Sequence, residues 1–158
     1  MDKPTLYIET SIVSYLAADP SRHPVTARNQ QLTHDWWNTR RKQFELCTSE
    51  AVVREVSLGD PAMVQRRLAL LGGIRVLPVE ERVTALSLDV RSALRLPERA
   101  ATDALHVAST AINGVAYLLT WNCTHLANPA LWPRMERVCR EHGSKLPVLC
   151  TPAELMEE

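Results

Sequence analysis

The sequence predicts an α/β fold, a three-layer α/β/α sandwich built around a five-stranded parallel sheet. Short apolar runs alternate with longer segments of helical periodicity along all 158 residues. Within these runs apolar and polar residues do not alternate, which is typical of parallel strands covered on both faces. The chain contains no linker, repeat or low-complexity stretch, so we expect one domain over residues 1–158.

The first half of the chain is expected to contain three strands and four helices. Apolar runs predict strands at residues 5–8, 44–48 and 74–77. Helical spacing and capping residues predict helices at roughly 11–18, 25–43, 50–58 and 61–71. Thr10 or Ser11 is the expected N-cap of the first helix, which ends at the turn-forming segment 19–24. Ser49 and Asp60 are the expected N-caps of the third and fourth helices.

The second half is expected to add two strands and further helices. Apolar runs predict strands at residues 115–120 and 147–150. Helices are expected at 80–95, 97–112 and roughly 129–142. The helix that opens at Pro97 is the most apolar, and Asn113-Gly114 ends it. A capping box at residues 151–154 predicts a last short helix.

Composition and charge exclude several classes of protein. The 46% hydrophobic and 23% charged residues are ordinary globular values, unlike those of disordered, collagen-like or coiled-coil chains. No apolar stretch approaches the ~18 residues that cross a bilayer, so no membrane association is expected. The 18 basic and 18 acidic residues cancel, whereas a protein with a wide footprint on duplex DNA is normally basic. Any contact with nucleic acid must therefore use a local patch, or a groove that a second subunit completes.

The N-terminus and the cysteines indicate the cellular compartment. The segment 1–11 shows no basic region followed by an apolar one, so no secretory signal is expected. The cysteines lie far apart without CxxC spacing, which argues against zinc; they are Cys47, Cys123, Cys139 and Cys150. We therefore expect a cytoplasmic protein with free thiols.

Three acids and one amide are expected to meet at the carboxyl edge of the sheet, where open α/β folds bind ligands. Glu9 directly follows the first strand, and Glu55 lies within two turns of the helix after the second. Asp103 lies near the start of the helix that runs back into the fourth strand. Because such a helix must begin at the carboxyl edge, Asp103 belongs there too. Asn122 comes two residues after the end of the fourth strand.

Oxygen ligands gathered in this way predict a divalent cation. At about 4 Å and an effective dielectric constant near 20, each pair of carboxylates costs on the order of 4 kcal/mol. A hard cation such as Mg²⁺ removes that cost, prefers oxygen ligands and keeps bound waters. This chemistry is suited to phosphodiester hydrolysis. Any one of these acids alone would be interpreted as a helix cap or dipole partner, and their coincidence at one edge favours the metal site.

Hydroxyl and histidine side chains lie next to these positions in the sequence. Thr10, Ser11 and Thr120 could hydrogen-bond the carboxylates or a phosphate, or could instead cap helices and end a strand. His106 and His125 could donate to a carboxylate or a phosphate, but neither has the spacing of a histidine metal motif. We therefore interpret His106 as a structural histidine.

Aromatic and basic residues provide the candidate surfaces. Trp36 and Trp37 are adjacent on one predicted helix and cannot share a face, so we expect one in the core and the other at a partner surface. The runs 40–42 and 66–67 are the densest basic segments. Such runs are usually a solvated face, but in a neutral protein they are the best candidates for contacts to a nucleic-acid backbone.

Four motifs follow one another along the chain: YIETS at 7–11, TSEAVVREV at 48–56, ATDALHVA at 101–108 and LLTWN at 118–122. Over about residues 5–155 they resemble the ordered motifs of the PIN-domain family, and within it the VapC-type toxins of bacterial toxin–antitoxin pairs. The resemblance implies the sandwich described above and an endoribonuclease that depends on Mg²⁺ or Mn²⁺. It also implies a homodimer and inhibition by a cognate antitoxin.

The resemblance places the four acidic positions of the family at Glu9, Glu55, Asp103 and Asn122. Glu9, Asp103 and Asn122 would then hold the metal ion, while Glu55 would orient or deprotonate the attacking water, or share the ion. The sequence departs from the family twice, because Glu9 and Asn122 stand where the family usually has Asp. The longer side chain at 9 would shift the ion or bend, and the amide at 122 would bind it more weakly.

Three hypotheses for the function follow. The first is a metal-dependent endoribonuclease that leaves a 5′-phosphate and a 3′-hydroxyl, because water attacks rather than the 2′-hydroxyl. The second is a catalytically weak or inactive module with the same fold that binds RNA or a protein. The third is a metal-dependent phosphatase acting on small phosphoesters, which the same acids would support.

Overall fold

Five parallel strands form the centre of the molecule. The computed structural model describes residues 2–156, so residues 1, 157 and 158 of the predicted domain lie outside the described part. The strands are β1 (Thr5–Ile8), β2 (Glu45–Ser49), β3 (Arg75–Leu77), β4 (Tyr117–Leu119) and β5 (Val148–Cys150). They are ordered β3-β2-β1-β4-β5, and every neighbouring pair is parallel. The predicted five-stranded parallel sheet is therefore confirmed.

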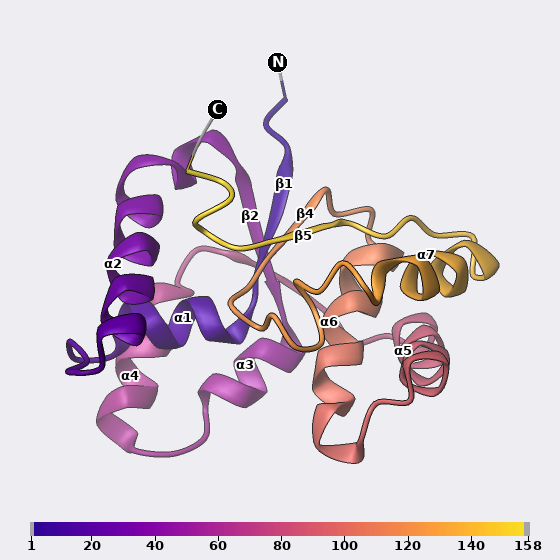
Figure 1. Cartoon of the computed structure of the whole chain (residues 1–158), viewed down its shortest axis with the longest axis horizontal. Coiled ribbons are helices and arrows are strands. Elements are labelled where there is room, and N and C mark those ends of the chain that lie inside the picture. The colour runs from indigo at the N-terminus through magenta and orange to yellow at the C-terminus, as the bar shows by residue number, and fades with distance from the viewer. Residues whose placement is uncertain (1, 157–158) are drawn as a thin grey trace.

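Helices cover the sheet on both sides. They are α1 (Thr10–Ala17), α2 (Pro24–Thr39), α3 (Glu50–Val56), α4 (Pro61–Leu70), α5 (Glu81–Leu94), α6 (Ala101–Ile112) and α7 (Trp132–Glu141). In Figure 1, α1, α2 and α4 lie on one side of the central strands, and α5, α6 and α7 lie on the other. The predicted α/β/α sandwich is confirmed. None of the helices within residues 2–156 combines the length and the apolar character needed to cross a membrane.

The middle of the sheet is covered on both faces, as the uninterrupted apolar runs predict. Leu6, Tyr7 and Ile8 follow one another on β1 and are all fully buried, although consecutive side chains point to opposite faces. Trp36 is also fully buried, whereas Trp37 is partly exposed and lies 4.5 Å below the guanidinium of Arg41. The expectation that one tryptophan lies in the core is confirmed, and the expectation that the other lies at a partner surface stays a prediction.

Several element boundaries differ from the predicted ones for local reasons. α1 begins at Thr10 with Glu9 at the N-cap position, so neither Thr10 nor Ser11 is the N-cap. Both hydroxyls donate to carboxylates instead, which removes them from capping. The segment after Pro97 first forms a 3₁₀ turn, and α6 begins only at Ala101. The predicted helix 25–43 ends at Thr39 and is followed by a separate 3₁₀ turn, η1 (Arg41–Gln43).

The capping box at the end of the chain forms without starting a helix. Glu154 Oε1 accepts hydrogen bonds from the backbone N and the hydroxyl of Thr151, at 3.0 and 3.1 Å. The chain nevertheless makes only turns between residues 152 and 155. The prediction of a short terminal helix is therefore wrong within the described residues, because capping residues alone do not supply the hydrogen-bonded turns that a helix needs.

Asp60 gives a direct test of a predicted helix cap. Its Oδ2 accepts a hydrogen bond from Met63 N at 3.2 Å at the start of α4. Replacing Asp60 by Ala should lower the free energy of unfolding by about 1 kcal/mol, because the amide loses its partner. Urea denaturation measures this loss. Asp60→Asn is the matched control and should keep most of the stability, since Asn caps as well as Asp; equal losses in both variants would contradict the capping role.

Candidate metal centre

The order of the strands creates a crevice at the carboxyl edge of the sheet. From β1 the chain goes first to β2 and β3 on one side, and later to β4 and β5 on the other. Connections that leave in opposite directions from adjacent strands open a crevice between β1 and β4, where ligands bind in such folds. Glu9 directly follows β1 and Thr120 directly follows β4, so both side chains lie at this point.

Glu9 is held by two hydroxyl groups in an almost fully buried position. Only 5% of its surface is exposed. Ser11 Oγ and Thr120 Oγ1 both donate to Glu9 Oε1, each at 2.5 Å. Ser11 Oγ also accepts a hydrogen bond from Trp121 N at 2.8 Å, which ties the loop after β4 to α1. The hydrogen bonds to Oε1 leave Oε2 of this carboxylate without a donor among the described residues.

Glu55 reaches the same place from α3. Its Oε1 accepts a hydrogen bond from Thr10 Oγ1 and lies 2.9 Å from His106 Nε2. Burial disfavours the charged form, but the hydrogen bonds from His106 and Thr10 and the attraction of His106 outweigh it, so the pKa of Glu55 is lowered. Glu55 is therefore ionised at neutral pH. Of the roles that the sequence leaves open for Thr10, Ser11 and Thr120, hydrogen bonding to the carboxylates is the one that the structure shows.

His106 links the two carboxylates to the interior of the sheet. Its Nδ1 lies 2.7 Å from Tyr7 Oη, which lies 2.7 Å from Ser49 Oγ, and all three residues are fully buried. Burial by itself lowers the pKa of His106, but the hydrogen bond to Glu55 and the charges of Glu9, Glu55 and Asp103 outweigh it and raise the pKa. The imidazole of His106 therefore pairs with the carboxyl groups of Glu9 and Glu55.

The other two predicted residues make different contacts. Asp103 lies in the first turn of α6, and its Oδ2 is 2.9 Å from His125 Nδ1. Asn122 Oδ1 accepts hydrogen bonds from the backbone N of Thr124 and of His125, at 3.2 and 3.0 Å. Asn122 therefore shapes the loop that brings His125 to Asp103. That Asn122 also coordinates an ion stays a prediction.

The donor set at the centre of the site fits a divalent cation. Glu9, Glu55 and His106 each offer one ligand atom within 4.8 Å of the other two. Within residues 2–156, the basic side chains paired with Glu9, Glu55 and Asp103 are all histidines, without Lys or Arg. Both glutamates keep an oxygen that accepts no hydrogen bond there. Two carboxyl groups, each with an oxygen that accepts no hydrogen bond, are the donors that Mg²⁺ or Mn²⁺ takes.

Sequence reasoning undervalued two residues of this centre. The lack of a histidine metal motif predicts a structural role for His106, and Tyr7 has no predicted role in the site. Two signals pointed to them. Tyr7 lies two residues before Glu9, so both side chains point to the same face of the extended chain. His106 lies three residues after Asp103, so both lie on the same side of α6.

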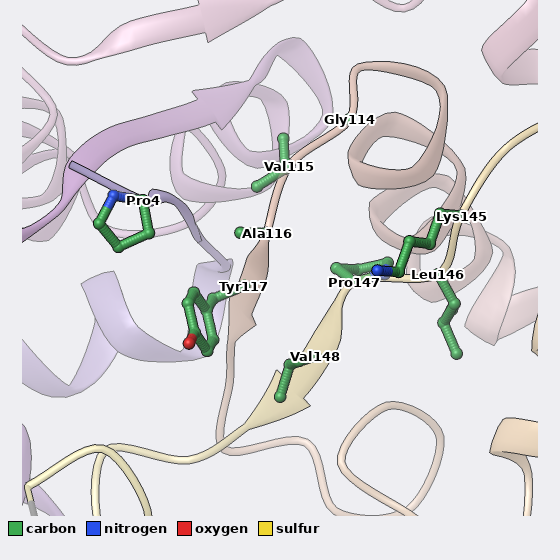
Figure 2. A pocket seen from close by; sticks show the side chains of 9 residues that line it. All are labelled: Pro4, Gly114, Val115, Ala116, Tyr117, Lys145, Leu146, Pro147 and Val148. Carbon is green, nitrogen blue, oxygen red and sulfur yellow. The ribbon is translucent and has the colours of Figure 1, made fainter. Parts of the chain in front are cut away.

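Other features lie away from the centre. A cavity of about 420 Å³ opens at the opposite, amino edge of the sheet, and its lining includes Pro4, Lys145, Pro147 and Val148 (Figure 2). It contains no carboxylate, so it is not part of the acidic site. The cysteines are free, as expected, and burial raises the pKa of the Cys47 thiol to about 11, which keeps it protonated.

The basic runs are partly engaged within the molecule. Arg66 forms an ion pair with Asp19 at 3.0 Å, and Arg67 Nη1 donates to the carbonyl of Leu58 at 3.0 Å. Arg41 stacks on Trp37, as described above. The expectation that these runs contact a nucleic-acid backbone stays a prediction.

Comparison with known proteins identifies the fold. No protein-family model matches the sequence, and no curated protein matches it. Among solved structures, the chain is similar to FitAB bound to an IR36 DNA fragment, with a TM-score of 0.59 and 19% identity over 97% of this chain and 99% of that one. It is also similar to VapBC2 from Rickettsia felis bound to promoter DNA, with a TM-score of 0.55 and 16% identity over 75% and 88%.

A third similar structure is VapC20 from Mycobacterium tuberculosis, described as a toxin that cleaves the sarcin–ricin loop. The TM-score is 0.55, with 16% identity over 76% of this chain and 92% of that one. At this level of identity the three likenesses establish the fold. The chain has the fold of the VapC-type PIN-domain toxins, as its motifs predict.

Proposed function

We propose that this chain is a metal-dependent endoribonuclease that hydrolyses RNA phosphodiester bonds, and that it is the toxin of a toxin–antitoxin pair. The observation that carries this proposal is the convergence of Glu9 and Glu55 at the crevice between β1 and β4, each with a free oxygen. The fold supports it, because one similar structure is a toxin that cleaves the sarcin–ricin loop and two others are VapBC2 and FitAB, each bound to a DNA fragment.

Glu9 and Glu55 hold the cation, Mg²⁺ or Mn²⁺, and Asp103 is the third acid of the site. When bound, such an ion stabilises charge on the phosphoryl oxygens and lowers the pKa of a bound water. Ser11 and Thr120 fix the orientation of Glu9 through its Oε1.

Glu55 also handles the proton of the attacking water. It is partly exposed and ionised, so its carboxylate accepts the proton while the water oxygen forms the new bond to phosphorus. The bond that breaks joins phosphorus to the 3′-oxygen, which takes a proton from solvent water as it leaves, so the products are a 5′-phosphate and a 3′-hydroxyl.

The partners follow from the same proposal. The substrate is RNA, and a cognate antitoxin protein inhibits the enzyme. The homodimer implied by the resemblance and the role of Asn122 as a fourth metal ligand stay predictions. The cytoplasm is the expected location, since RNA is present there and thiols stay reduced.

Cleavage of RNA with and without a metal ion tests the proposal. Purified protein should cut RNA in Mg²⁺ or Mn²⁺, lose the activity in EDTA and regain it when the ion is restored. Product ends are checked by labelling, which should find 5′-phosphates. RNA cleavage that persists in EDTA would exclude the mechanism, and nucleotide hydrolysis without RNA cleavage would favour the phosphatase.

An inactive binding module is the second candidate. It is favoured by the contacts of Asn122, whose side-chain oxygen serves two backbone amides rather than an ion. Calorimetric titration with Mn²⁺ separates the two functions. A nuclease should show a saturable site, whereas a module that has lost its ion should show none.

A further inference from the structure

The imidazole of His106 has a place in the candidate centre that the proposed function does not yet use. Its Nε2 lies 2.9 Å from Glu55 Oε1 and 3.8 Å from Glu9 Oε2. One ligand atom from each of the three side chains lies within 4.8 Å of the other two. Two carboxylate oxygens and an imidazole nitrogen at such separations are able to share one ion.

The orientation of this ring is fixed from behind. Tyr7 Oη is 2.7 Å from Nδ1 and also 2.7 Å from Ser49 Oγ, so the phenol bridges the two side chains. Because the ring is fully buried, it cannot turn toward solvent, and Nε2 remains the nitrogen that faces both carboxylates. Histidines that bind metals are typically held in this way, through a polar partner on the other ring nitrogen.

We propose that His106 Nε2 is a direct ligand of the cation held by Glu9 and Glu55, and that the site therefore selects a transition-metal dication over Mg²⁺. This inference rests on the proposed function, because it assumes a cation between the two glutamates. Imidazole nitrogen suits transition metals, whereas Mg²⁺ takes oxygen ligands and keeps its waters. The ion displaces the Nε2 proton that points at Glu55 in the metal-free protein, and this proton is released to solvent. Tyr7 is then a positioning residue that fixes the ring for coordination.

Metal binding tests this assignment without an activity assay. Metal-free full-length protein is titrated with MnCl₂ and with MgCl₂ by calorimetry, for the wild type and for His106→Gln. The substitution should weaken Mn²⁺ binding about tenfold or more, and should weaken Mg²⁺ binding less. His142→Gln is the matched control, because His142 also pairs with a carboxylate, Asp89, at 2.6 Å but outside this centre. It should bind both ions like the wild type.

Pulsed electron paramagnetic resonance of the Mn²⁺-loaded wild type identifies the ligand directly. A directly bound imidazole should give a nitrogen coupling that changes when the histidines carry ¹⁵N in place of ¹⁴N. This measurement needs no variant, so it decides the question even if His106→Gln does not fold. Saturable Mn²⁺ binding without a nitrogen coupling would overturn the assignment of His106 and leave the proposed cation site intact. Absence of saturable binding of either ion would overturn both.

Discussion

Replacing Glu9 by Gln should lower the rate of RNA cleavage by at least about 10³-fold at saturating metal, because a bound ion contributes several kcal/mol of transition-state stabilisation. The amide keeps an oxygen for the hydrogen bonds from Ser11 and Thr120, so the local structure should survive. It removes the charge and turns the second oxygen of the carboxylate into an NH₂ group, which cannot coordinate an ion.

The measurement combines cleavage kinetics with a calorimetric Mn²⁺ titration. Glu9→Gln should lose activity and metal affinity together, while its circular dichroism spectrum stays that of the wild type. Glu50→Gln is the matched control, because Glu50 is an exposed glutamate at the start of α3 whose carboxylate accepts a hydrogen bond from Val79 N at 3.1 Å, away from the acids. It should cleave at the wild-type rate. Wild-type cleavage by Glu9→Gln would show that the reaction takes place elsewhere.

The fold was predictable because short sequence patterns, which recur along the chain, mark its strands and helices. Each parallel strand is an apolar run, and turn and cap residues such as Ser49 and Asp60 mark where helices begin. Helix boundaries were predicted less well where a side chain that could cap the helix makes a tertiary hydrogen bond instead. Thr10 and Ser11 are good N-caps by type, but the carboxylates of Glu55 and Glu9 take their hydroxyls. Single-sequence patterns do not contain that competition.

The candidate site was predictable where the backbone alone decides it. Topology places the residue after β1 and the residues after β4 at one edge, so Glu9 and Asn122 fall near each other whatever their side chains do. Which atoms meet depends on side-chain rotamers and burial. In the structure His106 lies close to both glutamates, whereas the side-chain oxygen of Asn122 accepts hydrogen bonds from the backbone of the loop.

Removing the hydroxyl that bridges Tyr7 and His106 should have the second large effect, which is a loss of stability of the fold. Tyr7→Phe keeps the ring in the core but removes the hydroxyl that meets His106 Nδ1 and Ser49 Oγ. Burial, assisted by the charges of Glu9 and Glu55, raises the pKa of Tyr7, so the wild-type phenol keeps its proton for a hydrogen bond.

A buried imidazole nitrogen without its partner costs about 1–3 kcal/mol, so Tyr7→Phe should lower the free energy of unfolding by about 2 kcal/mol. Urea denaturation of the metal-free protein measures this, so that ion binding does not contribute. Tyr117→Phe is the matched control, since Tyr117 packs on Phe44 from β4 and its hydroxyl makes no hydrogen bond within residues 2–156. It should change stability by less than about 0.5 kcal/mol. If Tyr7→Phe and Tyr117→Phe had equal free energies of unfolding, His106 would be held by packing and not by the phenol hydroxyl.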